Sequence, residues 1–241
     1  PLDRALQMAQ GCLQHSQQTV SDYTAMMVKR EQVGGALSEH QFLAIKVRNR
    51  KLDAAGQITQ PMSVYLNFLR PSSVKGREVI YVENQNEGNV VAHEGGFKGR
   101  FLPTVTIPPT GMLAMRGQRY PITEIGLENL IVKLIERGGR VRSMPGVECE
   151  FRTGAKVKDR DCTVIAVTVP NRLPGAEFHK AQVFLDNEYN LPIRYIAWDW
   201  PKRAGGSLEV IEEYTYMAIK LNVGLQASDF DPYNKAYNFH S

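Results

Sequence analysis

Residues 62–94 read MSVYLNFLRPSSVKGREVIYVENQNEGNVVAHE, and this stretch decides the fold. Three runs rich in valine, isoleucine, tyrosine and phenylalanine, at 63–69, 77–83 and 90–93, alternate with segments that hold proline, serine, glycine and asparagine. β-Branched and aromatic residues favour strands, whereas these small and polar residues favour turns. The stretch therefore predicts an antiparallel meander of three strands.

The composition is that of an ordinary globular protein. Of 241 residues, 43% are hydrophobic and 22% are charged, and we expect one domain over 1–241. The 29 basic and 25 acidic residues are spread along the chain, so no basic stripe indicates a nucleic-acid partner. No run approaches the roughly 20 apolar residues of a membrane-spanning helix. The chain begins at Pro1 without an apolar leader, which fits a mature or trimmed protein.

Two segments show the periodicity of amphipathic helices. An N-terminal helix is predicted at about 2–17 from the apolar positions Leu2, Leu6, Ala9 and Leu13. A second helix is predicted at 121–137, because Pro121 suits a first turn and Gly138 and Gly139 suit a stop. Its broad apolar face includes Ile125, Leu127, Leu130, Ile131, Leu134 and Ile135. That face packs as core against a sheet or covers a cavity, and the sequence leaves both interpretations open.

The rest of the chain reads mainly as strands, at 20–33, 41–48, 100–107, 147–152, 162–169, 178–186, 191–198 and 208–222. We expect a protruding loop at 49–60 and a short last helix capped by Asp231. An open antiparallel sheet of this size must curl. The predicted fold class is α+β and mostly antiparallel β: a curved, incompletely closed β-barrel, or half-barrel, with the helices packed on its concave side.

The three cysteines give a weak indication of the redox environment. Cys149 and Cys162 come to lie opposite one another if the turn near Ala155 and Lys156 is symmetric. One interpretation is a cross-strand disulfide, which would indicate an oxidising compartment. The other is a pair of buried free thiols. Cys12, on the apolar face of the first helix, is predicted to be core.

Motifs for catalysis, metal binding or cofactor binding are missing from the sequence. The five histidines are scattered, and none has a second ligand at metal spacing. There is no nucleophile elbow, phosphate loop or C-x-x-C motif. Gly95, Gly96 and Gly99 are predicted to form a loop, because Phe101 begins an extended run. We therefore expect no catalytic residue, no metal and no cofactor.

Longer sequence patterns resemble a bacterial domain-of-unknown-function family of envelope proteins. The pieces that carry the resemblance are Asp22-Tyr23-Thr24-Ala25, Lys29-Arg30-Glu31, Val64-Tyr65 to Arg70-Pro71, Lys75-Gly76-Arg77-Glu78-Val79, Pro121 to Leu127, Asn190 to Tyr195, Asp199-Trp200-Pro201, Glu213-Tyr214-Thr215-Tyr216, Leu221 to Leu225 and Asp229-Phe230-Asp231-Pro232. More distantly, the order of helix, long hairpin and Arg-Pro turn is similar to the LolA/LolB-like lipoprotein carriers and receptors and to the RseB-like lipoprotein sensor of an anti-sigma system. The resemblance implies a half-barrel with an apolar cavity, in the periplasm or at the outer membrane.

The leading hypothesis is a non-enzymatic binding module for a lipid, a lipoprotein acyl chain or another apolar ligand. Aromatic and methionine side chains suit such a cavity, although for any single one of them an ordinary core is the favoured interpretation. The residues predicted to line it are Met27, Leu66, Phe68, Tyr81, Ile131, Leu134, Tyr195 and Trp198. The alternative is an envelope scaffold or sensor that binds another protein, with a filled interior and an exposed apolar patch.

Overall fold

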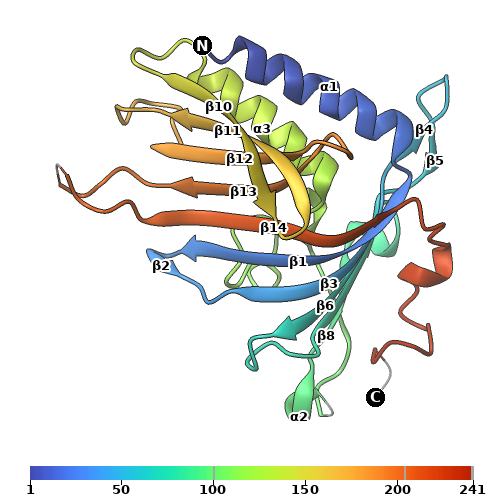
Figure 1. Cartoon of the computed structure of the whole chain (residues 1–241). Coiled ribbons are helices and arrows are strands. Elements are labelled where there is room, and N and C mark those ends of the chain that lie inside the picture. Colours follow the sequence, from blue (N-terminus) through green and yellow to red (C-terminus); the bar gives the residue numbers. More distant parts are fainter. Residues whose placement is uncertain (100, 204, 240–241) are drawn as a thin grey trace. The chain divides into compact units, whose positions relative to one another are not determined.

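The computed structural model describes residues 1–99, 101–203 and 205–239 (Figure 1). The chain forms two compact units. Unit 1 comprises Pro1–Ser16, Lys29–Ser38 and Gly126–Met217, and unit 2 comprises Gln17–Val28, Glu39–Ile125 and Ala218–Ser241. The strands β1 (Asp22–Val33) and β14 (Val210–Leu221) each contribute residues to both units. The single domain expected over 1–241 stays a prediction.

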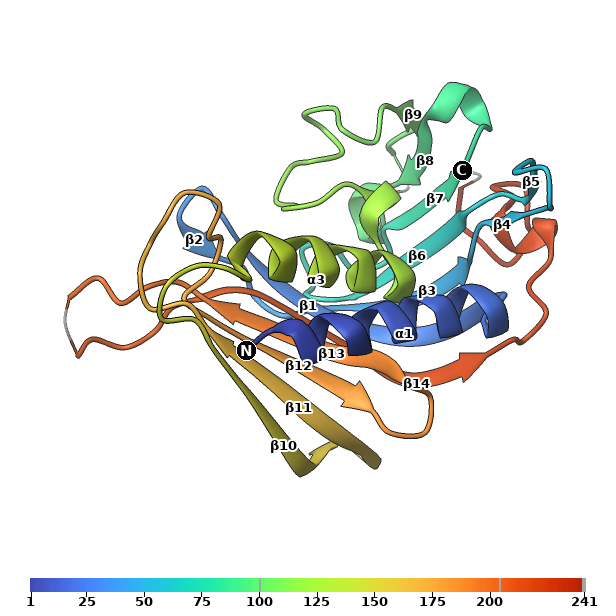
Figure 2. The same ribbon diagram turned by 90° about the horizontal axis from the view of Figure 1, so that it is seen from above.

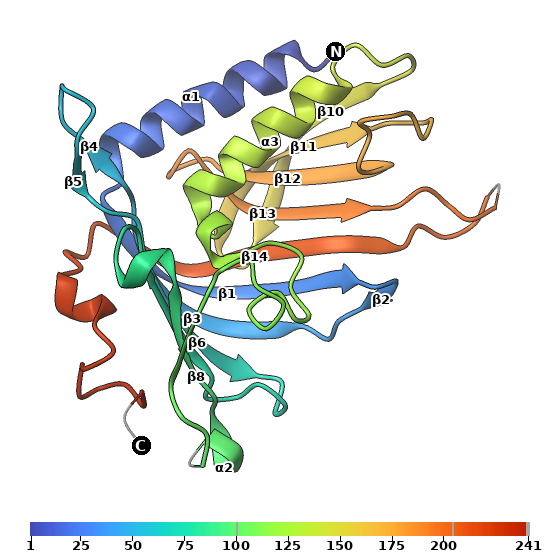
Figure 3. The same ribbon diagram turned by 180° about the vertical axis from the view of Figure 1, so that it is seen from behind.

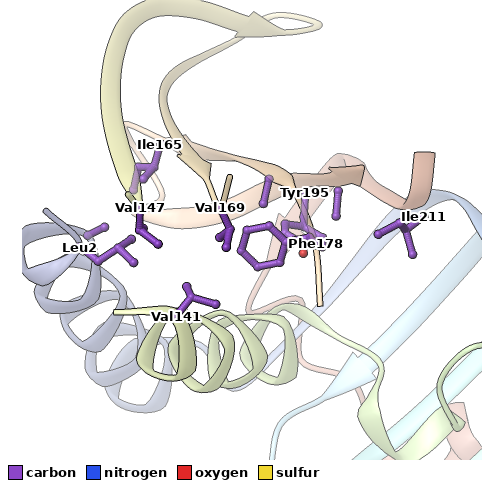
Figure 4. Packing of buried hydrophobic residues seen from close by; sticks show 11 residues of the cluster. Leu2, Val141, Val147, Ile165, Val169, Phe178, Tyr195 and Ile211 are labelled. Atoms are coloured by element: carbon purple, nitrogen blue, oxygen red, sulfur yellow. The ribbon is translucent and has the colours of Figure 1, made fainter. Parts of the chain in front are cut away.

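Unit 1 combines two long helices with antiparallel strands. In addition to parts of β1 and β14 it contains most of α1 (Asp3–Thr19), together with β2 (Ala36–Leu37), α3 (Leu127–Val141), β10 (Glu148–Val157), β11 (Arg160–Thr168), β12 (Lys180–Asp186) and β13 (Leu191–Trp198). Both helices lie over the same face of these strands (Figures 2 and 3). The core between them is shown in Figure 4 and includes Leu2, Val141, Val169, Phe178 and Tyr195. Burying each such large apolar side chain contributes roughly 1.5–3 kcal/mol.

Unit 2 is built on the meander predicted from residues 62–94. Its elements are β3 (Gln41–Arg48), β4 (Lys51–Leu52), β5 (Ile58–Gln60), β6 (Ser63–Arg70), β7 (Glu78–Val82), β8 (Val90–His93), α2 (Gly96–Gly99), β9 (Val105–Ile107) and the 3-10 turns Asn86–Gly88, Ile122–Glu124 and Ala227–Phe230. The antiparallel registers Tyr65↔Ile80 and Ile80↔Val91 confirm the meander.

The C-terminal segment covers the meander with aromatic side chains. Phe230, Tyr237 and Phe239 pack against Tyr65, Ile80, Val82 and Val91. The rings of Tyr65 and Tyr237 are stacked with centroids 4.2 Å apart. The buried carboxylate of Glu78 accepts hydrogen bonds from the Tyr65 hydroxyl and from the backbone N–H of Asn238, each at 2.6 Å. The last segment is therefore an integral part of the core of unit 2.

The predicted fold class is confirmed. The hydrogen-bonded strand order is β10-β11-β12-β13-β14-β1-β3-β6-β7-β8-β9, with β2 beside β1, and every strand pair whose register is resolved is antiparallel. Among the described residues, the end strands β10 and β9 do not pair with each other, so the sheet is not closed. The N-terminal helix is confirmed as well, with its end at Thr19 rather than at about residue 17.

The second helix was predicted with the wrong ends. Pro121 precedes a single 3-10 turn, and the α-helix runs from Leu127 to Val141. Gly138 and Gly139 lie inside the helix instead of ending it. A Cβ atom at Gly138 would come within 2.9 Å of Leu6 Cδ2, whereas one at Gly139 would meet no atom within 4 Å. Gly138 thus allows α1 to approach α3. The sequence does not reveal this contact, because two successive glycines after a helical pattern indicate the end of a helix.

The register predicted for Cys149 and Cys162 is wrong. The turn of this hairpin lies at residues 158–159, so Cys149 pairs with Val167 and Cys162 pairs with Ala155. A β-bulge between Arg152 and Ala155 shifts the register further. Both thiols are free, because residues that are not cross-strand partners cannot be bridged without moving the backbone.

Four smaller predictions also need correction. Residues 49–60 form the hairpin β4–β5 instead of a loop, and Gly96–Gly99 form one helical turn. The strand expected at 100–107 is limited to Val105–Ile107, and Arg100 lies outside the described residues. The last helical turn, Ala227–Phe230, ends before Asp231, whose carboxylate accepts a hydrogen bond from the Tyr233 N–H. Asp231 therefore caps a tight turn and no helix.

Candidate functional site

An apolar cavity lies within unit 1, between the two helices and the strands β11, β12 and β13. Its volume is about 80 Å³. The wall is formed by Leu2, Ala5, Leu6, Met8, Ala9, Cys12, Ile131, Leu134, Arg137, Gly138, Ile165, Val167, Phe178, Ala181, Val183, Leu185, Pro192 and Tyr195. An engineered cavity of about 150 Å³ takes benzene, so this one has room for the end of a hydrocarbon chain.

The periodicity of each element explains why its residues reach the wall. On α1 the contributing positions recur every three to four residues and form one stripe of the helix. On β12 the residues Ala181, Val183 and Leu185 alternate along the strand and share one face of the sheet. The wall therefore combines a helical stripe with one strand face, separated by more than 150 positions in the chain.

The helices α1 and α3 both contribute to the wall and approach each other closely there. Leu6 packs against Gly138, where the glycine leaves no side chain between them. Leu2, which also lines the cavity, and Val141 are both buried in the core. An ion pair between Arg142 Nε and Asp3 Oδ1, at 2.6 Å, joins the same ends of the two helices. The start of α1 and the end of α3 are therefore held together.

Arg137 is the only charged residue in the described wall of the cavity. Its Nη1 atom donates hydrogen bonds to Glu212 Oε1 at 2.7 Å and to the Tyr195 hydroxyl at 3.0 Å. Its Nε atom donates to Glu177 Oε2 at 3.0 Å. Neither glutamate lines the cavity. The guanidinium is thus directed to carboxylates outside the wall.

The network continues from Arg137 across the inner strands of unit 1. The Tyr214 hydroxyl donates to Glu31 Oε1 at 2.5 Å and also lies 3.2 Å from Glu212 Oε2. Glu31 also pairs with Lys29 at 3.0 Å. These buried charges are matched in pairs, which is the condition for keeping ionised groups out of water. The network ties α3 to the sheet.

Cys12 lines the cavity as a protonated thiol. Burial raises its pKa to about 11, so the nucleophilic thiolate is scarce at neutral pH. Its Sγ atom lies 3.5 Å from Asn190 Oδ1. One turn further on α1, the Oγ atom of Ser16 is buried and has no hydrogen-bond partner among the described residues.

The structure brings together three of the eight residues predicted to line a cavity, namely Ile131, Leu134 and Tyr195. Trp198 belongs to unit 1 but lies outside the wall. The other four, Met27, Leu66, Phe68 and Tyr81, belong to unit 2. A role of any of the eight in ligand binding stays a prediction.

The sequence reasoning missed the contributions of α1, β11 and β12. The apolar stripe of α1 is visible in the sequence, but the sequence does not show that this stripe lines a cavity. The alternation of apolar side chains along 178–186 is visible in the sequence. The strand pairing that places this strand under the helices is not. Among the described residues, no group of three or more His, Cys, Asp and Glu residues could hold a metal ion. In the same part of the chain, no helix is long and apolar enough to cross a membrane.

Several solved structures share similarity with the chain along nearly its whole length. A DUF1329 family protein from Desulfovibrio piger has 14% identity and a TM-score of 0.43, with coverage of 96% of this chain and 97% of the other. A putative outer membrane lipoprotein-sorting protein domain from Vibrio parahaemolyticus has 12% identity, a TM-score of 0.42 and the same coverages. The Mycobacterium tuberculosis lipoprotein LppX has 12% identity and a TM-score of 0.47, with coverage of 95% and 100%.

No curated protein sequence matches the chain. The family described as "Protein of unknown function (DUF1571)" matches residues 20–239, which is most of the sequence. The match includes all of the central meander and the strands of unit 1. The chain belongs to the DUF1571 family.

Proposed function

We propose that this protein is a non-enzymatic binding module of the bacterial envelope, periplasmic or associated with the outer membrane. Its ligand is a lipid, the acyl chain of a lipoprotein or another apolar molecule. The observation that carries the proposal is the almost wholly apolar wall in unit 1, contributed by both helices and the strands β11 to β13. The envelope location rests on the sequence resemblance described above.

The energetics favour a hydrocarbon in this cavity. Each methylene group moved from water to an apolar site contributes about 0.8 kcal/mol. The cavity offers an incoming chain few polar groups that would have to lose water, because Arg137 is directed to Glu177 and Glu212. Small apolar cavities of this kind stay dry and take up apolar guests.

The same wall supports a function without catalysis. The residues that line it include no histidine, aspartate or glutamate, and hence no acid–base pair beside Cys12. The raised pKa of Cys12 keeps that thiol protonated at neutral pH. A reactive cysteine needs the opposite environment, with nearby positive charge and a lowered pKa.

Native mass spectrometry of freshly purified protein, with mass analysis of its organic-solvent extract, tests the proposal. We expect a bound mass in the lipid range, or binding of an added acyl ligand. The variant Leu134→Lys places a charge in the wall and should abolish binding. The matched variant Glu136→Lys, at an exposed position of the same helix, should retain it. Equal binding by the two folded variants would refute the assignment of this cavity.

A second candidate function is a scaffold that binds another envelope protein. It is favoured by Phe97 and Phe101 in unit 2, which are 76% and 75% exposed. Their rings pack edge to face with centroids 5.4 Å apart. If the protein stays free of ligand after incubation with phospholipids and acylated peptides, this candidate replaces the first. Substitution of both rings by serine would then be expected to abolish binding of the partner.

A further inference from the structure

One segment of unit 2 gathers exposed apolar side chains. Eleven large hydrophobic side chains are exposed among the described residues, and five of them lie within residues 97–113. These five are Phe97, Phe101, Leu102, Met112 and Leu113. Single apolar side chains at the surface are ordinary, whereas a concentration of them indicates contact with a partner.

The same segment accounts for the net positive charge of the chain. Between Glu94 and Glu124 the sequence holds four basic residues and no acidic one. The chain has 29 basic and 25 acidic residues, so 25 of each lie outside this segment. The four basic residues are Lys98, Arg100, Arg116 and Arg119. A partner that suits the segment therefore combines an apolar layer with negative charge.

The first part of the segment forms a tip beyond the end of β8 (Figures 1 and 3). We call the helical turn α2, together with Phe101 and Leu102, the α2 tip. The backbone N–H of Leu102 donates to the Gly99 carbonyl at 3.3 Å, so the chain folds back on the turn. The rings of Phe97 and Phe101 pack edge to face and are 76% and 75% exposed. They therefore form one apolar surface instead of two isolated side chains.

The base of the α2 tip is fixed to the turn between β6 and β7. A Cβ atom at Gly95 would come within 2.1 Å of the Gly76 carbonyl carbon and 2.3 Å of the Lys75 carbonyl oxygen, so this backbone contact requires a glycine. An ion pair between Arg77 Nη2 and Glu94 Oε1, at 3.0 Å, joins the same two parts of the chain. A surface on a fixed base loses little conformational entropy when it binds.

The charge beside the α2 tip is positive in excess. Lys75 is exposed, and its backbone lies against the start of the tip at Gly95. Arg77 and Glu94 neutralise each other. Association of two copies of this chain through their tips would bring like charges together, which is unfavourable. A second copy is therefore a poor partner for this surface.

We propose that the α2 tip docks on a membrane surface that contains anionic phospholipids. Phe97 and Phe101 insert among the lipid head groups, and the excess positive charge of this part of the chain attracts the phosphate groups. Phenylalanine and leucine beside lysine and arginine are the composition of segments that lie in the interface of anionic membranes. A lipid surface admits two protruding rings without a complementary pocket. The proposal stands on unit 2 alone and does not depend on the cavity in unit 1.

Cosedimentation of the complete protein with phospholipid vesicles tests the proposal. Vesicles of phosphatidylcholine alone are compared with vesicles that contain equal parts of phosphatidylcholine and phosphatidylglycerol. The anionic vesicles should bind at least about tenfold more tightly, because each basic residue near an anionic surface strengthens binding about fivefold. Salt at about 1 M should remove this difference, because it shortens the Debye length to about 3 Å.

A double variant tests the two rings. Phe97→Ser with Phe101→Ser should weaken binding to the anionic vesicles at least about thirtyfold, because two exposed apolar side chains no longer leave water. Tyr233→Ser is the matched control, since Tyr233 is also 76% exposed and belongs to unit 2. It should bind as the wild-type protein does. The urea midpoint of the double variant should be unchanged, because both rings are exposed.

A charge reversal tests the electrostatic part. Lys75→Glu should weaken binding to the anionic vesicles about twentyfold and leave binding to the neutral vesicles unchanged. Lys158→Glu makes the same change in net charge at an exposed lysine of unit 1. It should weaken binding less than about threefold, because the effect of a charge is screened beyond the Debye length.

The outcomes decide between the partners. Equal binding by the wild-type protein and the double phenylalanine variant overturns the proposal, and so does equal binding to neutral and anionic vesicles. If the folded wild-type protein binds neither vesicle, the membrane proposal fails and the rings are left for the protein partner of the second candidate function. Ligand binding in the cavity is measured separately, so the failure of one proposal is distinguished from the failure of the other.

Discussion

Replacement of Arg137 by methionine should destabilise the protein strongly. Methionine retains the apolar length of the arginine side chain but removes its hydrogen bonds to Glu177, Tyr195 and Glu212. Glu212, which is 2% exposed, would lose its ion pair with Arg137 at 2.7 Å. Removing one partner of a buried ion pair costs about 3–5 kcal/mol. We expect the free energy of unfolding to fall by this amount.

The control lies on the same helix. Arg140 also pairs with Glu177, but its side chain is 51% exposed, and exposed ion pairs contribute about 0–1 kcal/mol. Arg140→Met should therefore change stability by no more than that. The double variant Arg137→Met with Glu212→Gln should recover at least half of the loss, because both charges of the buried ion pair are then removed.

The free energy of unfolding of all three variants is measured by urea unfolding, followed by tryptophan fluorescence. The slope of each transition is compared with that of the wild-type protein, because equal slopes show that unfolding exposes the same amount of surface. The reasoning is refuted if Arg137→Met costs no more than Arg140→Met. It is also refuted if the double variant is less stable than the single one, since the buried carboxylate would then not be the source of the loss.

Three further predictions follow from local contacts. Gly139→Ala should stabilise the protein by about 1 kcal/mol in urea unfolding, and Gly138→Ala by less, because only the latter crowds α1; equal gains would contradict the close approach. Burial tends to raise the pKa of Asp186, but Arg160, at 2.5 and 2.7 Å, and two backbone N–H groups lower it overall. Asp186→Asn should therefore be most destabilising at pH 7, and the loss should shrink as the pH falls from the unfolded pKa of about 3.9 through the lower folded pKa; a loss independent of pH would refute this. Alkylation of the native protein should modify Cys149 first, with three adducts after unfolding, whereas a single adduct after unfolding would reveal a disulfide.

The sign of the Asp186 prediction follows from linkage. A carboxyl whose pKa is lower in the folded state stabilises the fold above its unfolded pKa of about 3.9. This contribution is lost as the pH falls through the folded pKa. The window in which the two proteins converge is therefore below pH 4.

Much of the fold could be predicted from local sequence. The meander at 62–94 is defined by strand-forming runs and turn residues that act within a few positions of one another. The N-terminal helix is defined by a stripe of apolar residues with helical spacing. Both were predicted correctly because the signals and the structures they specify are local.

The errors occurred where distant parts of the chain set the local outcome. Gly138 has the sequence signature of a helix stop, yet it lies within α3 because Leu6 packs against it. Cys149 pairs with Val167 because the hairpin turns at 158–159 and contains a bulge, and the residue numbers alone do not reveal this register.

The candidate site shows the same division between features set by local sequence and features set by distant parts of the chain. The sequence by itself determined that Ile131, Leu134 and Tyr195 are apolar-facing residues of a helix and a strand, since periodicity encodes which face is buried. Only the tertiary structure decided that they meet α1 and β12 around one cavity, and that Arg137 is neutralised by Glu177 and Glu212. The physical reason is that burial patterns specify a face, whereas the partner of that face is selected by packing and charge pairing between elements far apart in the chain.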